Sequence, residues 1–221
     1  MLYNIDTGIS FKINDYNKLK LLNKIAFDIK KDKIKFIKKD RNIKHFHGEI
    51  IFYILINNLN YDTEAINIRI LDKNLNSTYL QLKSALNFIL DRNIPAIINL
   101  SLGLMIDDYI DDFKDIIQRL LQKQIFIISS ASKVPSYPSV LEDVISVSDL
   151  NMYQNDRAEI KHKIDFIVDI GKFNYDFIPY SSTSFAAPFV TAQAANIMNE
   201  KNISNINELR EELTKYFERW E

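Results

Sequence analysis

The sequence contains no cysteine and only four glycines in 221 residues. Without cysteine, the chain has no disulfide framework and no thiol chemistry. Glycine makes up about 2% of the chain, against a typical share of roughly 7%. The remaining glycines are therefore expected where a side chain cannot be tolerated. They are Gly8, Gly48, Gly103 and Gly171.

Long apolar runs and an excess of charge of one sign are also missing. The longest apolar run, residues 50–56, is far too short to cross a bilayer, and the first residues do not resemble a signal peptide. The formal net charge of −1 gives no electrostatic reason to expect a nucleic-acid or membrane partner. Lysine runs at 30–39 alternate with apolar residues, which is typical of a solvated hairpin face. We therefore expect a cytoplasmic protein.

What is present describes an ordinary globular chain. Apolar residues make up 47% of the sequence and charged residues 26%. The length and the absence of repeats or linkers predict one domain spanning residues 1–221. Strand-like and helix-like segments alternate, which predicts a three-layer α/β fold with a mostly parallel sheet flanked by helices.

Periodicity and capping signals place the individual elements. Strands are predicted at residues 2–5, 24–29, 33–38, 64–71, 96–103, 125–129 and 164–168. Helices are predicted near His47, from Ser77 to about Leu90, at 107–122, from Ser184, and from Asn205 to about Trp220. A short helical turn is expected at 16–22, and Gly171 is expected in the turn after the last strand.

The segment of residues 182–188, Ser-Thr-Ser-Phe-Ala-Ala-Pro, opens a helix of small apolar residues. A serine at this place can be an ordinary N-cap, and these residues alone leave that interpretation open. It does not explain Pro188, which removes a backbone donor near the first turn. A nucleophile here would gain from the helix dipole and from free N–H groups that can hold an oxyanion.

Residues 183–188 resemble the nucleophile motif Gly-Thr-Ser-x-Ala-x-Pro of the subtilisin-like serine proteases, or subtilases. Upstream, residues 6–9, Asp-Thr-Gly-Ile, resemble the aspartate motif of that family. His47-Gly48 resembles its histidine motif, in which glycine follows the base, and this selects His47 over His45. The order Asp…His…Ser is that of subtilisin. Taken singly, Asp6 could lie in an ordinary Asp-x-Gly turn and His47 could be structural.

Two further stretches match the family. Residues 98–103, Ile-Asn-Leu-Ser-Leu-Gly, resemble the segment whose backbone pairs with an extended substrate, which implies substrate binding by Ser101, Leu102 and Gly103. Where subtilases read Ala-Ala-Gly-Asn, this chain has Ser-Ser-Ala-Ser at 129–132. Ser132 therefore occupies the position of the asparagine that donates to the oxyanion. The Ser184 backbone N–H would be the other oxyanion donor.

The resemblance implies a serine endopeptidase in which Ser184 attacks, His47 is the base and Asp6 orients the imidazole. The substrate would be a peptide or protein. No carboxylate cluster with calcium-loop spacing is apparent in the sequence, so we expect no metal or other cofactor. We expect a limited cut in a precursor, such as leader-peptide removal. The alternative is a weak or inactive pseudoprotease that binds peptides or acts as a scaffold. Ser132 favours this alternative, as does the lack of a pro-segment before Asp6. Without a pro-segment, we expect that the fold assembles unaided or that a partner chain assists folding or delivers substrate.

Overall fold

The computed structural model describes residues 1–12, 15–16, 18–105, 107–157, 159–170 and 182–217. Its strands are β1 (Leu2–Asp6), β2 (Asp15–Tyr16), β3 (Leu19–Lys30), β4 (Lys33–Ile37), β5 (Thr63–Arg69), β6 (Ala96–Leu100), β7 (Ile125–Ser130), β8 (Ile145–Asp149) and β9 (Phe166–Val168). Its helices are α1 (His47–Asn58), α2 (Tyr79–Arg92), α3 (Ile110–Leu121), α4 (Leu150–Asp156), α5 (Thr183–Glu200) and α6 (Ile206–Phe217), with a 3-10 turn, η1, at Asp107–Tyr109.

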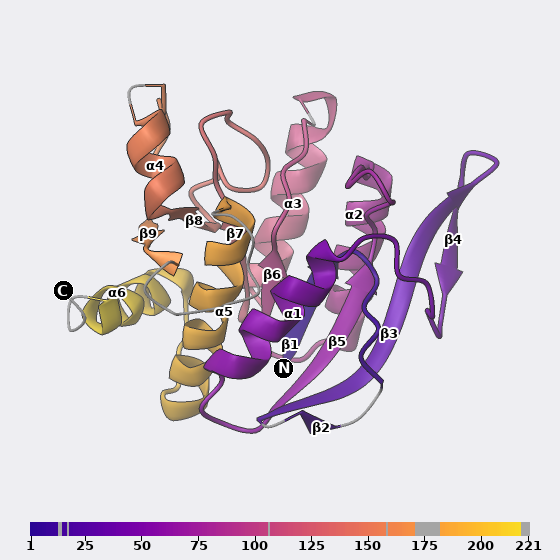
Figure 1. The fold of residues 1–221 in the computed structure, drawn as a ribbon, viewed down its shortest axis with the longest axis horizontal. Coiled ribbons are helices and arrows are strands. Elements are labelled where there is room, and N and C mark those ends of the chain that lie inside the picture. Colours follow the sequence, from indigo (N-terminus) through magenta and orange to yellow (C-terminus); the bar gives the residue numbers. More distant parts are fainter. Residues whose placement is uncertain (13–14, 17, 106, 158, 171–181, 218–221) are drawn as a thin grey trace.

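The strands form one mostly parallel sheet in the order β2-β3-β5-β1-β6-β7-β8-β9. From β3 to β9, neighbouring strands in this order pair in parallel. The antiparallel pairs lie at one edge, where β3 meets β2 and β4. The predicted hairpin of 24–29 and 33–38 is thus present, at the right of the sheet in Figure 1.

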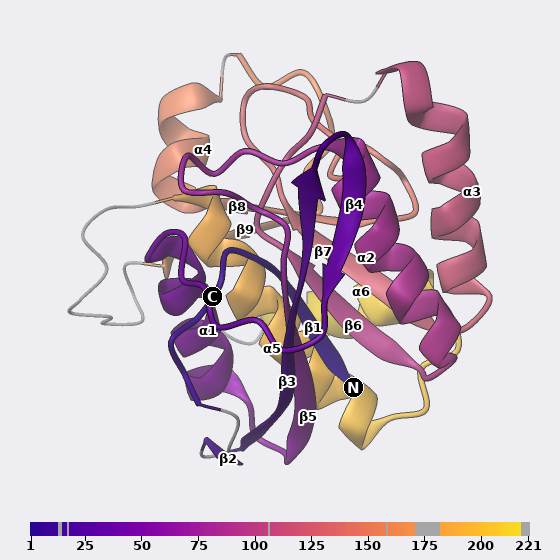
Figure 2. The same ribbon diagram turned by 90° about the vertical axis from the view of Figure 1, so that its right-hand side faces the viewer.

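Helices cover both faces of the sheet. Figure 2 shows α2 and α3 on one side and α1 and α5 on the other. Two hydrophobic cores match these layers, and alternate residues of β1 enter them: Leu2 belongs to the core under α1 and α5, and Tyr3 to the core under α2 and α3. Since both faces are covered, β1 is buried along its whole length. The predicted three-layer α/β fold is confirmed.

Helix α5 lies at the centre of its layer. Every residue from Phe185 to Ile197 is buried, and most of them are apolar, as expected for a helix enclosed on all sides. Among the described residues, no helix is both long enough and apolar enough to cross a bilayer.

Several predicted boundaries were wrong. Thr78, and not Ser77, caps α2, because its hydroxyl accepts from the Gln81 N–H while the Gln81 side chain accepts from the Thr78 N–H. The strand predicted at 96–103 ends at Leu100, and a first turn of 3-10 helix precedes α3.

Elsewhere the predicted elements needed larger changes. The helical turn expected at 16–22 is wrong, because β3 begins at Leu19 and pairs with β5. Helix α4 was not predicted. It begins where the Asp149 carboxylate accepts from two N–H groups of its first turn. Gly171 and Trp220 lie outside the described residues.

Candidate active site

Asp6 and His47 meet at the carboxyl end of the sheet. Asp6 is the last residue of β1, and His47 is the first residue of α1. The His47 Nδ1 lies 2.9 Å from Asp6 Oδ1. A carboxylate can only accept, so Nδ1 carries the proton and Nε2 is left as the free base. Asp6 is fully buried and His47 is 6% exposed.

Thr7 connects the end of β1 to the start of α1. Its backbone N–H donates to Asp6 Oδ1 over 2.6 Å, and its hydroxyl accepts from the Gly48 N–H over 2.8 Å. A Cβ at Gly48 would lie 2.4 Å from Thr7 Oγ1 and 3.3 Å from Asp6 Oδ1. The glycine after the histidine therefore lets helix α1 approach the carboxylate closely enough for the hydrogen bond to His47 to form.

The surroundings of His47 raise its pKa above the usual 6.5. Burial acts to lower the pKa, but the charge of Asp6 and the hydrogen bond to it outweigh burial. The Asp6–His47 pair therefore favours the imidazolium, the form that follows proton transfer from a nucleophile.

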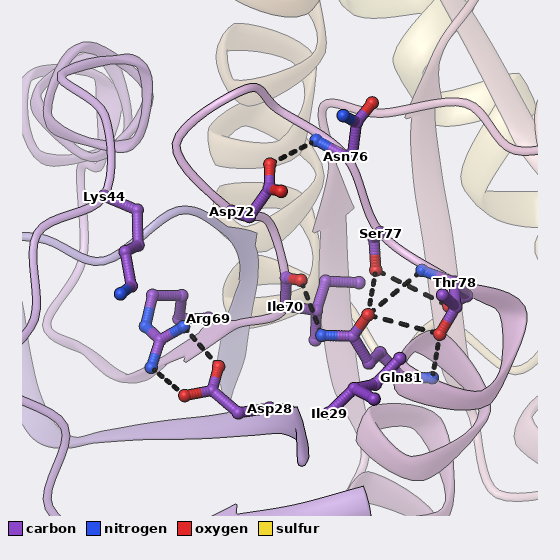
Figure 3. Close-up of a pocket in the computed structure, with 10 residues that line it drawn as sticks. All are labelled: Asp28, Ile29, Lys44, Arg69, Ile70, Asp72, Asn76, Ser77, Thr78 and Gln81. Atoms are coloured by element: carbon purple, nitrogen blue, oxygen red, sulfur yellow. Dashed lines mark hydrogen bonds and ion pairs between the residues drawn. The ribbon is translucent and has the colours of Figure 1, made fainter. Parts of the chain in front are cut away.

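A cluster around the buried Arg69 holds the segment that leads to His47. The Arg69 Nε donates to Asp40 over 2.8 Å, and a terminal nitrogen donates to Asp28 over 2.6 Å. Figure 3 shows the Arg69–Asp28 pair beside Lys44. These residues line a cavity of about 420 Å³. The hydrogen bond from Arg69 holds the pKa of Asp28 below its usual range. Asp40 in turn accepts from the Asn42 N–H, five residues before His47.

The glycine of the aspartate motif packs against this same segment. A Cβ at Gly8 would lie 1.7 Å from the carbonyl oxygen of Asn42, closer than any side chain can come. The turn after Asp6 and the segment before His47 are therefore in direct contact.

Ser184 lies in the first turn of α5 and is hydrogen-bonded to the residue that follows β6. Pro188 has no N–H, so it cannot donate the usual helical hydrogen bond to the Ser184 carbonyl. The Ser101 hydroxyl donates to that carbonyl instead, over 2.9 Å. Ser101 is therefore buried behind the nucleophile position, and its side chain supports Ser184.

Ser182 is the N-cap of α5. Its hydroxyl accepts from the Ser184 N–H over 3.3 Å. This N–H is the backbone donor that the sequence motif assigns to the oxyanion. The hydroxyl of Ser182 thus occupies the hydrogen-bonding direction that an oxyanion would need.

Ser132 lies in the same cavity as Ser184. Both line a hollow of about 360 Å³ together with Leu102 and Gly103. The Ser132 hydroxyl donates to the Val134 carbonyl over 3.4 Å. The other lining residues are Met105, Ser130, Val134, Ser136 and Thr183, so no charged side chain faces this cavity among the described residues.

The two halves of the predicted triad lie close together, but within the described residues no hydrogen bond joins Ser184 Oγ to His47. The Ser184 hydroxyl instead donates to the Ser101 carbonyl over 3.4 Å. The contact between the halves is made by the next residue, since the rings of Phe185 and His47 lie 5.9 Å apart. His45 is not an alternative partner of Asp6, because its Nδ1 accepts from the His47 N–H.

The Thr7 link and the Arg69 cluster were missed from the sequence, whereas an N-cap serine was left open there without being assigned to Ser182. The serine two residues before Ser184 was a usable signal for the cap, because serine is a favoured N-cap residue. The other two depend on contacts between residues about 30 to 40 positions apart, which no local pattern reveals. Among the described residues, no group of three histidine, aspartate or glutamate side chains could hold a metal ion.

Comparison with solved structures identifies the fold. A cold-adapted subtilisin-like serine proteinase superposes with a TM-score of 0.63 at 16% sequence identity, covering 95% of this chain and 78% of that one. Sphericase superposes with a TM-score of 0.66 at 17% identity, covering 96% and 81%. No protein-family model and no curated protein matches the sequence. The chain therefore has the fold of the subtilisin-like serine proteinases.

Proposed function

We propose that this chain is a serine endopeptidase of the subtilisin type. The observation that carries the proposal is the buried hydrogen bond between His47 and Asp6, formed beside the start of the helix that bears Ser184. The fold shared with a subtilisin-like serine proteinase supports the same conclusion.

The proposed reaction is acyl transfer from a peptide bond to water. The Ser184 hydroxyl turns from the Ser101 carbonyl to His47 Nε2, gives up its proton there and attacks the peptide carbonyl carbon. The imidazolium then protonates the leaving amine, and water hydrolyses the acyl-enzyme by the same route. Asp6 stays ionised and stabilises the imidazolium. The Ser184 N–H and the Ser132 hydroxyl are the proposed oxyanion donors.

The substrate we propose is a peptide or protein with an uncharged side chain at the cleaved bond. The cavity beside Ser184 has serines and apolar side chains around it, and its described lining offers no ion-pair partner. A charged side chain would lose its hydration there without compensation. We propose a limited cut in one precursor, such as removal of a leader peptide. A serine in place of asparagine at position 132 makes a slow enzyme, which one recognised or delivered substrate can tolerate.

The test is covalent labelling by a fluorophosphonate probe. We expect the folded protein to be labelled and Ser184→Ala to be unlabelled, with the adduct located at residue 184 by mass spectrometry. Ser182→Ala is the matched control, because it removes a neighbouring hydroxyl and keeps the nucleophile. Absence of label from folded parent protein would refute the proposal.

One observation favours the second candidate, a peptide-binding pseudoprotease. Both polar groups of Ser184 that the reaction needs are hydrogen-bonded elsewhere, the N–H to Ser182 and the hydroxyl to Ser101. A pseudoprotease would bind an uncharged peptide beside Gly103 without cleaving it, and Ser184→Ala would keep its biological activity. Loss of that activity in Ser184→Ala would favour the endopeptidase.

A further inference from the structure

Three asparagines lie side by side in the middle of the sheet. Asn4 on β1 pairs in register with Asn67 on β5 and with Asn99 on β6. All three are at most 1% exposed. They lie on the same face of the sheet as Asp6, because Asn4 and Asp6 are two residues apart in β1 and such residues point the same way. Amides in the middle of parallel strands are unusual, since such strands are generally continuous apolar runs.

The three amides form one directed chain of hydrogen bonds. The Asn99 Nδ2 donates to Asn4 Oδ1 over 2.9 Å, and the Asn4 Nδ2 donates to Asn67 Oδ1 over 2.8 Å. The Asn67 Nδ2 then donates to the Thr7 carbonyl over 3.3 Å. Every link runs in the same direction, from β6 towards the turn that follows Asp6.

The other end of the chain reaches α5. The Asn99 Nδ2 also donates to the Ser101 hydroxyl over 3.1 Å, and this hydroxyl donates to the Ser184 carbonyl. The Thr191 hydroxyl lies 3.0 Å from Asn99 Oδ1 and 2.8 Å from the Ala187 carbonyl, so its one proton is shared between two acceptors. Asn99 thus contacts α5 directly through Thr191 and indirectly through Ser101.

The two contacts restrict the rotation and the axial position of the N-terminal half of α5, and Asn196 forms hydrogen bonds with Asn58 and Asn60 farther along the helix. Ser184 and Thr191 are seven residues apart, which is close to two helical turns, so they lie on the same side of the helix. Their partners are Asn99, near the end of β6, and Ser101, the residue that follows this strand. A helix held at two points on one line can neither rotate nor slide without breaking a buried hydrogen bond, which is costly.

We propose that Asn4, Asn67, Asn99 and Thr191, here called the amide ladder, form a positioning device that sets where Ser184 stands relative to His47. The catalytic part of this inference rests on the proposed function. Apolar residues would fill the same space, and a buried polar network does not by itself add stability. What the ladder adds is a fixed geometry between the turn after Asp6 and the helix that carries Ser184.

The test compares Thr191→Val with Thr191→Ser. Valine keeps the shape and removes the hydroxyl, whereas serine keeps the hydroxyl. Misplacing a reacting group by about 1 Å can cost about 10²-fold in rate. We therefore expect fluorophosphonate labelling of Ser184 to be about 10- to 100-fold slower in Thr191→Val and close to the parent rate in Thr191→Ser. Asn4→Val, which interrupts the ladder away from both ends, should slow labelling similarly.

Thr63→Val is the matched control for loss of a buried threonine hydroxyl. The Thr63 hydroxyl donates to the Tyr61 carbonyl and accepts from the Asn199 side chain in the last turn of α5. Thr63→Val therefore also loses a hydrogen bond to α5, but at the end of the helix opposite Ser184. Thr63→Val should label at the parent rate even if its denaturation midpoint falls as far as that of Thr191→Val. Equal labelling rates in folded parent and Thr191→Val would overturn the proposal and leave the ladder a purely structural feature.

Crystal structures of parent and Thr191→Val give a readout that needs no activity. We expect Ser184 to shift relative to His47 in Thr191→Val and to stay in place in Thr191→Ser. If the parent protein is never labelled, the proposed function fails, and this shift still decides the positioning role. An unchanged position of Ser184 in Thr191→Val would overturn that role.

Discussion

The two halves of the candidate site differ in burial and in the lengths of their hydrogen bonds. The Asp6–His47 half is buried, and its hydrogen bonds span 2.6–2.9 Å. The Ser184 half is partly exposed, and the hydrogen bonds of its hydroxyl and its N–H span 3.3–3.4 Å. One half is held ready for proton transfer, whereas the other must rearrange before it can react. We therefore expect the rate of the proposed reaction to be limited at the serine and the oxyanion position.

The largest expected effect is in the ordered half. Asp6→Asn removes the acceptor that fixes the His47 tautomer, and by analogy with other triads the labelling rate should fall about 10⁴-fold. Stopped-time labelling with mass spectrometry measures this. Asp62→Asn, whose side chain is 92% exposed, is the matched control and should label like the parent. A fall of less than tenfold in Asp6→Asn would show that the pair does not act in catalysis.

The second largest expected effect is an increase in the labelling rate when the Ser184 half of the site is changed. Ser132→Asn restores a longer donor at the oxyanion position, and since such a donor is worth about 10²–10³ in turnover, labelling should speed up by a factor approaching this range. Ser132→Ala should be slower than the parent or equal to it. If Ser132→Asn is no faster than the parent, residue 132 does not face the oxyanion.

A smaller gain is expected at the helix cap. Ser182→Gly frees the Ser184 N–H, and because one hydrogen bond is worth about 0.5–1.5 kcal/mol, labelling should accelerate by up to about tenfold. Replacing an N-cap serine by glycine costs only a few tenths of a kcal/mol of stability. Chemical denaturation should therefore show almost no change. Slower labelling in Ser182→Gly would mean that the cap orders the nucleophile and does not compete with the oxyanion.

The smallest effect is a shift in pH dependence. His47 must be neutral to act as base, so the labelling rate should fall on acidification with a midpoint above pH 6.5, because the His47 pKa is raised. The raised His47 pKa also contributes to the free energy of unfolding. This contribution is fully present below pH 6.5 and is lost as the pH rises through the His47 pKa of the folded protein. In Asp6→Asn only burial remains, and the midpoint should move below 6.5. An unchanged midpoint in Asp6→Asn would exclude His47 as the titrating base.

The layered fold was predictable because its signals are local. Nearly continuous apolar runs such as residues 96–100 indicate strands covered on both faces, and the same strands appear in the sheet. Helix boundaries were less predictable where two adjacent residues can both act as the N-cap. Ser77 and Thr78 can both cap a helix, and the choice was decided by Gln81, three residues after Thr78.

The site was predictable only in part. Motif resemblance singled out Asp6, His47 and Ser184, and the structure brings the first two into contact. It could not reveal that the Ser184 hydroxyl points to Ser101. The amide ladder also escaped notice, because Asn4 and Asn99 are 95 positions apart and their contact depends on strand order and register.

Because Pro188 lacks an N–H, insertions and deletions at the end of β6 and after α5 have different effects on the position of Ser184. Because the Ser184 carbonyl takes its hydrogen bond from Ser101, the place of this carbonyl depends on the register of β6. Inserting one residue between Leu100 and Ser101 would turn the serine to the opposite face of the sheet, since side chains alternate along a strand. Lengthening or shortening the chain beyond Glu200 would leave this attachment intact. Changes in chain length after α5 therefore leave the attachment of Ser184 in place, whereas changes in length between β6 and Ser101 remove it.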